Sequence, residues 1–442
     1  MSITTGLGLA NRYSILNSSS PLPLRTVVTQ NRVQAGTETR GGADSQITRY
    51  FVVFGQDCSS ICLSLNGWTQ SGSGGAGGEI NVPNSVHVQK IAVVYNSTNA
   101  PATWSGSRTF EITSGAVDQK SDEIPASAFG VSKFTKGDIL ELRCHTKVDV
   151  AGVDVIPYTA AKVNDYTGQT QQTTLFLSTD YTVDNIDGTG VITFTGAGSL
   201  QTRSNGFRPM VWGRPLVDQP SFVVVGDSIA ESVNDNATYA MGTGLSTDPI
   251  RIHGVGYMQR AMRDTSNTTA SLKPCLNLAR SSAASFHFTG SNVKSKQLYK
   301  YARFGIDELG TNDPDNATIQ THVATIWSDM RAAGIEKIIR TDLCVRTTST
   351  DNWTTEANQT YLDARWQSGG EIEDLRTWFD TKLADNTIDY ILDTTSVKGT
   401  DPFKWKVDGS TANYTAADST HPSSRGHEFL AIDLRTLLNT IS

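Results

Sequence analysis

The stretch 221–232, SFVVVGDSIAES, decides the fold expected for the C-terminal half of the chain. Its three consecutive valines are typical of a strand that is buried on both faces. They run directly into Gly226-Asp227-Ser228, residue types that end strands. The sequence therefore predicts a turn that carries Ser228 at the carboxyl end of a buried strand. Serine is also a good helix cap, so its position alone leaves two interpretations, a cap or a nucleophile.

Strand-like and helix-like segments alternate from residue 216 onward. Such alternation predicts a parallel sheet covered by helices on both faces, with ligands beyond the carboxyl ends of its strands. The expected strands are 221–226, 273–280, 301–310, 335–345 and 388–394, and the expected helices are about 255–265, 316–334, 355–367, 371–385 and 423–441.

The preceding part of the chain, residues 46–215, has a β pattern. Short runs rich in Val, Ile, Thr and aromatic residues are divided by Gly, Asn, Asp and Ser, which predicts an all-β sandwich or jelly roll. Residues 1–45 are polar and without periodicity, so we expect an arm that orders against a partner. We expect the chemistry of 216–442 to be separable from the β region, although the short link at 213–220 leaves open a core shared by both parts.

Composition excludes several functional classes. The 442 residues carry a net charge of −7 without a basic stripe, which disfavours nucleic acid as a partner. No apolar run reaches the roughly 20 residues of a membrane span, and the N-terminal residues lack the pattern of a Sec signal peptide. The five cysteines have no metal-binding spacing, so no cofactor or metal is expected. A bridge between Cys58 and Cys62 stays open.

Three further stretches fall at predicted strand ends or in late loops: NLARSSA (277–283), LGTND (309–313) and DSTHPSSRGH (418–427). Asp418 and His421 are three residues apart, so in a turn the carboxylate can accept the Nδ1–H of the ring. That leaves Nε2 to take a proton from a serine. Asn312 offers an amide donor for an oxyanion, the Ser228 N–H offers another, and the loop around Ala279 offers a third.

Together these blocks resemble the SGNH, or GDSL-type, hydrolases. The matching residues are Gly226-Asp227-Ser228, Gly310-Thr311-Asn312-Asp313 and Asp418-Ser419-Thr420-His421, over about the last 220 residues. The resemblance implies a three-layer α/β/α fold, Ser228 as nucleophile, His421 as base, Asp418 as its partner, and Ser228 and Asn312 as oxyanion donors. The family's second block normally supplies a glycine N–H, and we place Ala279 at that position.

Simpler structural roles compete with the catalytic ones. We expect Asp227 to bond the turn or helix start and Asp313 to cap the following helix. His427 falls in the last predicted helix and is not expected to be the base. Arg280 either meets an anionic substrate or is an exposed loop residue. Three tryptophans of the β region either line a sugar platform or belong to the core: Trp68, Trp104 and Trp212.

The sequence thus favours a serine esterase that removes acetyl or other short acyl groups from a carbohydrate. The expected partner is an acetylated glycan or a small ester, and the expected location is extracellular or in a virion, such as a phage tail. The polar N-terminal arm suits attachment to a larger assembly or a homo-oligomer. One alternative is a non-catalytic glycan-binding attachment protein. The other is a lipase or thioesterase, which would differ from the esterase in the room that loops such as 231–252 leave for the acyl chain.

Overall fold

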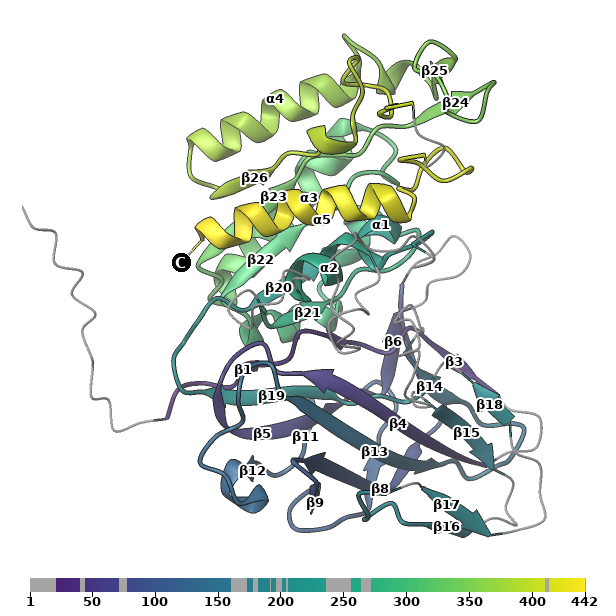
Figure 1. Cartoon of the computed structure of the whole chain (residues 1–442), viewed down its shortest axis with the longest axis vertical. Helices are drawn as coiled ribbons and strands as arrows, with labels where there is room; N and C mark the ends of the chain where they lie inside the picture. Colours follow the sequence, from purple (N-terminus) through teal and green to yellow (C-terminus); the bar gives the residue numbers. More distant parts are fainter. Residues whose placement is uncertain are drawn as a thin grey trace, which may run out of the picture.

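The computed structural model describes residues 21–39, 44–70, 78–159, 173–177, 182–190, 192–195, 201–203, 206–235, 256–263, 272–409 and 413–441. Figure 1 shows a parallel sheet with its helices in the upper half and antiparallel sheets in the lower half. Much of the loop 231–252 and of the predicted arm lies outside the described residues.

The parallel sheet has the strand order β2-β21-β20-β22-β23-β26. Every neighbouring pair in it runs parallel. This confirms the parallel sheet predicted for the C-terminal half. The strands are β2 (Asn31–Arg32), β20 (Phe222–Val225), β21 (Cys275–Asn277), β22 (Phe304–Asp307), β23 (Lys337–Thr341) and β26 (Tyr390–Leu392).

Helices cover both faces of this sheet because its central strand is apolar on both sides. Phe222 and Val224 pack with α2 and α5, whereas Val223 and Val225 pack with α3 and α4. The result is three layers, helices, sheet and helices (Figure 1). The helices are α1 (Ser228–Glu231), α2 (Tyr257–Arg263), α3 (Asn316–Ala332), α4 (Glu371–Ala384) and α5 (Ser424–Thr440).

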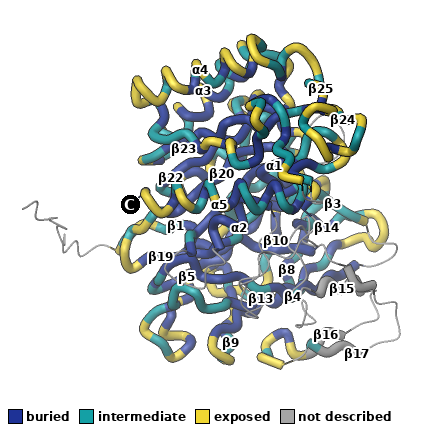
Figure 2. The backbone as a smooth tube through the Cα atoms, turned by 45° about the horizontal axis from the view of Figure 1, so that its top comes forward, coloured by how far each residue is buried: buried dark blue, intermediate teal, exposed yellow. Residues whose placement is uncertain are grey.

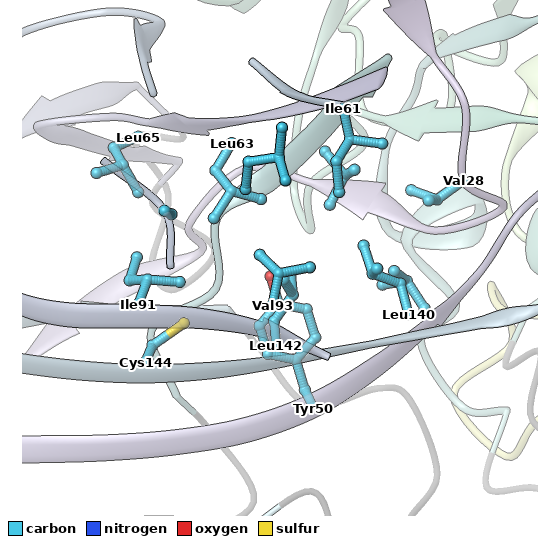
Figure 3. Close-up of a cluster of buried hydrophobic side chains, with 14 of the residues drawn as sticks. Val28, Tyr50, Ile61, Leu63, Leu65, Ile91, Val93, Leu140, Leu142 and Cys144 are labelled. Carbon is cyan, nitrogen blue, oxygen red and sulfur yellow. The ribbon is translucent and has the colours of Figure 1, made fainter. Parts of the chain in front are cut away.

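Two antiparallel sheets in the lower half face each other across one hydrophobic cluster, part of which Figure 3 shows. Leu63 and Val211 come from one sheet, and Val93 and Leu142 come from the other. The first sheet contains β1 (Arg25–Thr26), β5 (Cys58–Leu65), β11 (Gln119–Lys120), β12 (Ile124–Pro125) and β19 (Met210–Pro215). The second contains β4 (Ser45–Val53), β8 (Val86–Tyr95), β9 (Thr98–Pro101), β10 (Phe110–Ile112), β13 (Ile139–Lys147), β15 (Thr173–Leu177) and β18 (Gln201–Arg203).

Short hairpins and 3-10 turns complete the described chain. The paired strands are β3 (Gly36–Glu38) with β14 (Ile156–Tyr158), β6 (Trp68–Gln70) with β7 (Glu79–Asn81), β16 (Thr182–Asp184) with β17 (Thr193–Thr195), and β24 (Thr347–Ser349) with β25 (Gln359–Tyr361). The 3-10 turns are η1 (Ala126–Phe129), η3 (Ser285–Phe288), η4 (Ser295–Tyr301), η5 (Ala364–Trp366) and η6 (Thr395–Val397).

The helix predicted for 355–367 is wrong. This segment forms β25 and the 3-10 turn η5 instead. The reason is the Gln359 side chain, which accepts from Thr347 Oγ1 at 3.0 Å and donates to the Trp405 carbonyl at 2.8 Å. These long-range bonds hold the segment as a hairpin with β24, whatever its helical periodicity.

The segment predicted as an arm contributes strands to both halves of the molecule. Asn31 pairs with Leu276 at the edge of the parallel sheet. Its side chain donates to the Val211 carbonyl at 2.7 Å and accepts the Val211 N–H at 2.8 Å, and Val211 lies on β19. Residues 25–38 are therefore ordered against the chain's own sheets, which corrects the prediction for this part of the arm.

The two halves also share a core. One hydrophobic cluster joins Trp68 and Trp212 to Leu276, Tyr299 and Tyr301. The rings of Trp212 and Tyr301 stack at 4.3 Å. Figure 2 shows buried segments in both halves, among them β19 and β5 in one and β20 and β22 in the other. The predicted boundaries at 45/46 and 215/216, and a separate all-β domain between them, stay predictions.

Buried side chains settle two questions that the sequence left open. All three tryptophans considered for a sugar platform belong to the core, with exposed fractions of at most 5%. The five cysteines are free and buried, and Cys58 and Cys62 belong to different hydrophobic clusters. Among the described residues, no helix has the length and apolarity needed to cross a membrane.

The shared core argues against the expectation that the chemistry of 216–442 is separable from the β region, and it predicts that residues 216–442 do not fold well alone. Without β2 and Trp212, the shortened chain exposes apolar surface of the shared cluster, and we expect aggregation or loss of a cooperative thermal transition. A chain of residues 21–442 keeps every described contact and serves as the control. Size-exclusion chromatography would measure aggregation of the two chains, and thermal unfolding would measure the cooperativity of their transitions. A monomeric, cooperatively unfolding 216–442 would show that the shared cluster is dispensable.

Candidate active site

Ser228 begins the short helix α1, directly after the buried strand β20. Asp227 is the N-cap, and its carboxylate accepts the Ile229 N–H at 2.8 Å, as predicted for a residue that bonds the helix start. Position 226 requires glycine because neighbouring side chains leave no room for a Cβ atom. A Cβ there would lie 2.6 Å from the Ala230 Cβ and 2.9 Å from Glu308 Oε2.

The N–H groups around Ser228 are bonded, and the N–H of Ser228 itself is open. The Asp227 N–H donates to Glu308 Oε2 at 3.1 Å, and the Glu231 N–H donates to the Asp227 carbonyl at 2.9 Å. Among the described residues, no acceptor faces the Ser228 N–H. The turn therefore presents one free donor directly beside the serine hydroxyl.

Two buried carboxyls lie beneath this turn. Asp227 is fully buried and Glu308 is 4% exposed. Burial raises the pKa of Glu308 well above its ordinary value, and the neighbouring Asp227 carboxylate raises it further. Burial also raises the pKa of Asp227, against the opposing effect of the Ile229 N–H. Burial of the two carboxyls side by side therefore favours the protonated form of Glu308, because adjacent buried carboxylates repel each other.

The side chains of Ser228, His421 and Asp418 form a continuous chain of hydrogen bonds. His421 Nε2 lies 2.7 Å from Ser228 Oγ, and Nδ1 lies 2.6 Å from Asp418 Oδ2. The carboxylate fixes the proton on Nδ1, so Nε2 is the acceptor for the serine hydroxyl. The loop before α5 thus brings together the three residues that the sequence predicted.

Asp418 stays ionised in this arrangement. Partial burial alone would raise its pKa, but hydrogen bonds from the His421 N–H, the His421 ring and the Thr420 N–H lower the pKa below its ordinary value. The side chain of His421 is 17% exposed and that of Asp418 is 41% exposed. The serine end of the hydrogen-bonded chain is therefore more enclosed than the acid end.

Asn312 lies on an exposed turn next to the loop that follows β21. Its Nδ2 donates to the Ala283 carbonyl at 3.0 Å. This bond uses one amide hydrogen and fixes the orientation of the amide, so the second hydrogen is available to a ligand.

The prediction for Ala279 is wrong. Its N–H donates to Oδ1 of Asn277 at 2.8 Å, so that donor is already used. Three residues later, Ser282 is exposed and has φ 61°, in the left-handed region that favours glycine. No acceptor for the Ser282 N–H lies among the described residues. The open donor of this loop is therefore at Ser282.

His427 is not in contact with Ser228. It lies buried in α5, where Nδ1 accepts the Tyr257 N–H at 3.3 Å and Nε2 lies 3.1 Å from the Val233 carbonyl. Burial lowers the pKa of His427 to about 4, so the ring is neutral at physiological pH. Its exclusion as the base agrees with the prediction.

Two other predictions need correction. Arg280 is neither an exposed loop residue nor open to a substrate, because it is 2% exposed and its guanidinium lies over the Phe288 ring. Asp313 does not cap the following helix. It accepts from Ser285 Oγ at 2.6 Å, and Asp315 caps α3 by accepting the Thr318 N–H at 2.7 Å.

Sequence reasoning missed Glu308, Ser282 and Asn234, whose amide contacts Asp418. An acid directly after the apolar run of β22 was a usable signal for Glu308. The run of small residues after Arg280 was a weaker signal for Ser282. Nothing in the sequence pointed to Asn234. Among the described residues, no group of three or more His, Cys, Asp or Glu side chains could hold a metal ion.

No protein-family model and no curated protein matches the chain. Among solved structures, it is similar to one named as a GDSL-like lipase from Parabacteroides merdae, with 13% identity, a TM-score of 0.34, and coverage of 50% of this chain and 95% of that one. A family two carbohydrate esterase from Cellvibrio japonicus has 11% identity and a TM-score of 0.32, with coverage of 95% and 98%. A carbohydrate esterase family 3 structure from Talaromyces cellulolyticus has 14% identity and a TM-score of 0.30, with coverage of 50% and 98%. These similarities are distant, so the case for a function rests on the site geometry.

The hydrogen-bonded chain predicts opposite effects for the two histidines of this region. We expect His421→Ala to lose hydrolysis of an aryl acetate by orders of magnitude, because members of a hydrogen-bonded triad act as a unit. We expect His427→Gln to keep most of it, since glutamine retains a donor and an acceptor. Initial rates, with circular dichroism to verify folding, would measure this. An inactive, folded His427→Gln beside an active His421→Ala would reverse the assignment.

The buried His427 also predicts acid sensitivity. Its folded pKa of about 4 lies below the ordinary value of 6.5, so the unfolded state binds more protons between these values. Stability supported by the neutral ring is therefore lost as the pH falls from 6.5 towards 4. As the pH is lowered through this window, the Tm of His427→Gln minus the Tm of the wild type should increase. Thermal unfolding at several pH values would measure this difference. A constant difference in Tm would contradict this account.

Proposed function

We propose that this chain is a serine esterase that removes acetyl or other short acyl groups from a carbohydrate. The observation that carries the proposal is the bonded series Asp418–His421–Ser228 at the end of β20, with distances of 2.6 and 2.7 Å. It combines a nucleophile, a base and an orienting acid, which are the parts that acyl transfer requires.

In the first step, Ser228 Oγ attacks the ester carbonyl while His421 Nε2 takes the hydroxyl proton. The negative charge that develops on the carbonyl oxygen is stabilised by N–H donors. We assign these to the Ser228 N–H, the Asn312 amide and the Ser282 N–H in place of Ala279. Each such donor contributes roughly 3 to 4 kcal/mol to transition-state stabilisation.

The tetrahedral intermediate then collapses, and His421 gives its proton to the leaving alcohol. Water attacks the acyl-enzyme with His421 again as base, and the carboxylic acid and free Ser228 are released. Asp418 remains an anion throughout and stabilises the protonated ring. No metal or cofactor takes part in this sequence of steps.

Support for a carbohydrate ester comes from the sequence motifs, which resemble a family that acts on many esters, acetylated polysaccharides among them. The same motifs occur in lipases and thioesterases. We further propose that the antiparallel sheets, as a sandwich or jelly-roll unit, hold a polymeric substrate or join the chain to a virion such as a phage tail.

A series of acyl esters tests this function. We expect aryl acetate to turn over faster than esters of long acyl chains, and acetate to be released from an acetylated polysaccharide. Ser228→Ala should abolish both activities, and a sulfonyl fluoride should label Ser228. Ser59→Ala, on β5, is the matched control and should stay active. Faster turnover of long-chain esters would replace the proposal with a lipase or thioesterase. Glycan binding without turnover or labelling would indicate an attachment protein.

A further inference from the structure

Asn234 contacts the candidate acid from a separate part of the chain. Its Nδ2 donates to Asp418 Oδ2 at 2.5 Å, and the same oxygen accepts the Nδ1–H of His421 at 2.6 Å. An ionised carboxylate only accepts hydrogen bonds, so the amide must present its NH₂ group. Asn234 therefore touches the acid on the oxygen that orients the histidine.

The other hydrogen bonds of Asp418 come from its own turn. Oδ1 accepts the Thr420 N–H at 3.1 Å and the His421 N–H at 3.0 Å. Among the described residues, Asn234 is the only hydrogen-bond donor to this carboxylate from another element. Since the Asp418 side chain is 41% exposed, packing alone does not fix its rotation.

Asn234 is itself exposed, but the residues on both sides of it are anchored. It has φ 65°, a left-handed conformation that asparagine tolerates better than most residues. The preceding Val233 N–H donates to the Ser228 carbonyl at 2.9 Å. The following Asp235 forms a buried, two-bond ion pair with Arg260, with both distances 2.8 Å. One short segment therefore carries both the serine and the amide that reaches the acid.

We propose that Asn234 is a positioning residue that holds the Asp418 carboxylate so that His421 faces Ser228. This role rests on the esterase function proposed above. It acts through Asp418, because Asn234 touches neither Ser228 nor the ring. The amide also shares the negative charge of Oδ2, which moderates the attraction of the carboxylate for a protonated ring.

Two substitutions separate geometry from charge. Asn234→Gly tolerates the left-handed backbone and lacks the amide, and we expect kcat on an aryl acetate to fall about tenfold with KM nearly unchanged. Asn234→Asp keeps the shape but places a second carboxylate beside Asp418. This favours the protonated ring, so the acid limb of the pH–rate profile should move to higher pH. Among the described residues, the other charged or titratable groups that interact electrostatically with His421 or Asp418 are Asp227, His427 and Arg346.

Asn386→Gly is the matched control. Asn386 is exposed, has φ 61° and lies in the turn after α4, so it tests the same change at the same backbone conformation away from the site. We expect its kcat and pH profile to equal those of the wild type. A kcat for Asn234→Gly within twofold of the wild type, or an unshifted acid limb for Asn234→Asp, would overturn the proposal.

A proton NMR measurement decides the same question without turnover. The ring N–H bonded to Asp418 should give a low-field signal that is absent from His421→Ala. In Asn234→Gly we expect this proton to exchange faster with water, because the carboxylate is less fixed. An unchanged signal would refute the positioning role. If the wild type hydrolyses no ester, or Ser228→Ala stays active, the esterase function fails while this signal still reports on Asn234.

Discussion

The site depends on how the chain leaves the buried strand β20. Directly after Val225, the backbone must turn without leaving buried N–H groups unpaired, because each unpaired group is costly in a low-dielectric interior. Asp227 and Glu308 meet this constraint by accepting the N–H groups on both sides of Ser228. Among the described residues, the Ser228 N–H has no acceptor. A local requirement of hydrogen bonding thus leaves a free donor beside a hydroxyl that lies 2.7 Å from His421 Nε2, and it buries two acids side by side.

The same strand links the packing of the two halves. Its alternate side chains are buried on both faces, so both faces must be covered. The covering on the α3 and α4 side extends into the antiparallel sheets through Trp68 and Trp212. Asp118 strengthens this junction, since it accepts the Tyr301 hydroxyl at 2.5 Å and the Trp212 ring N–H at 3.1 Å. The candidate active site therefore lies on a sheet whose packing includes residues from the other half.

Much of this could be predicted from the sequence, and the failures have physical causes. Apolar runs such as the valines of β20 indicate strands directly, and the spacing of Asp418 and His421 allows a hydrogen bond within one turn. The helix at 355–367 failed because Gln359 makes long-range bonds that no local pattern reveals. Ala279 failed because Asn277 takes its N–H, a contact set by the path of the loop. Asn234 lay beyond prediction, since its meeting with Asp418 depends on tertiary structure alone.

The pairing of the first described strands has a consequence for biosynthesis. β1 pairs with β19, β2 with β21, and β3 with β14, so each early strand has a partner from far along the chain. On the ribosome, residues 25–38 emerge long before any of these partners exists. Closing such long loops is slow, and an unpaired strand edge invites association with other chains. Residues 27–29 can bond with residues 53–55 soon after synthesis, but the strand edges of β1, β2 and β3 must wait for partners that are complete only at residue 277. Until then these edges remain open to misassembly.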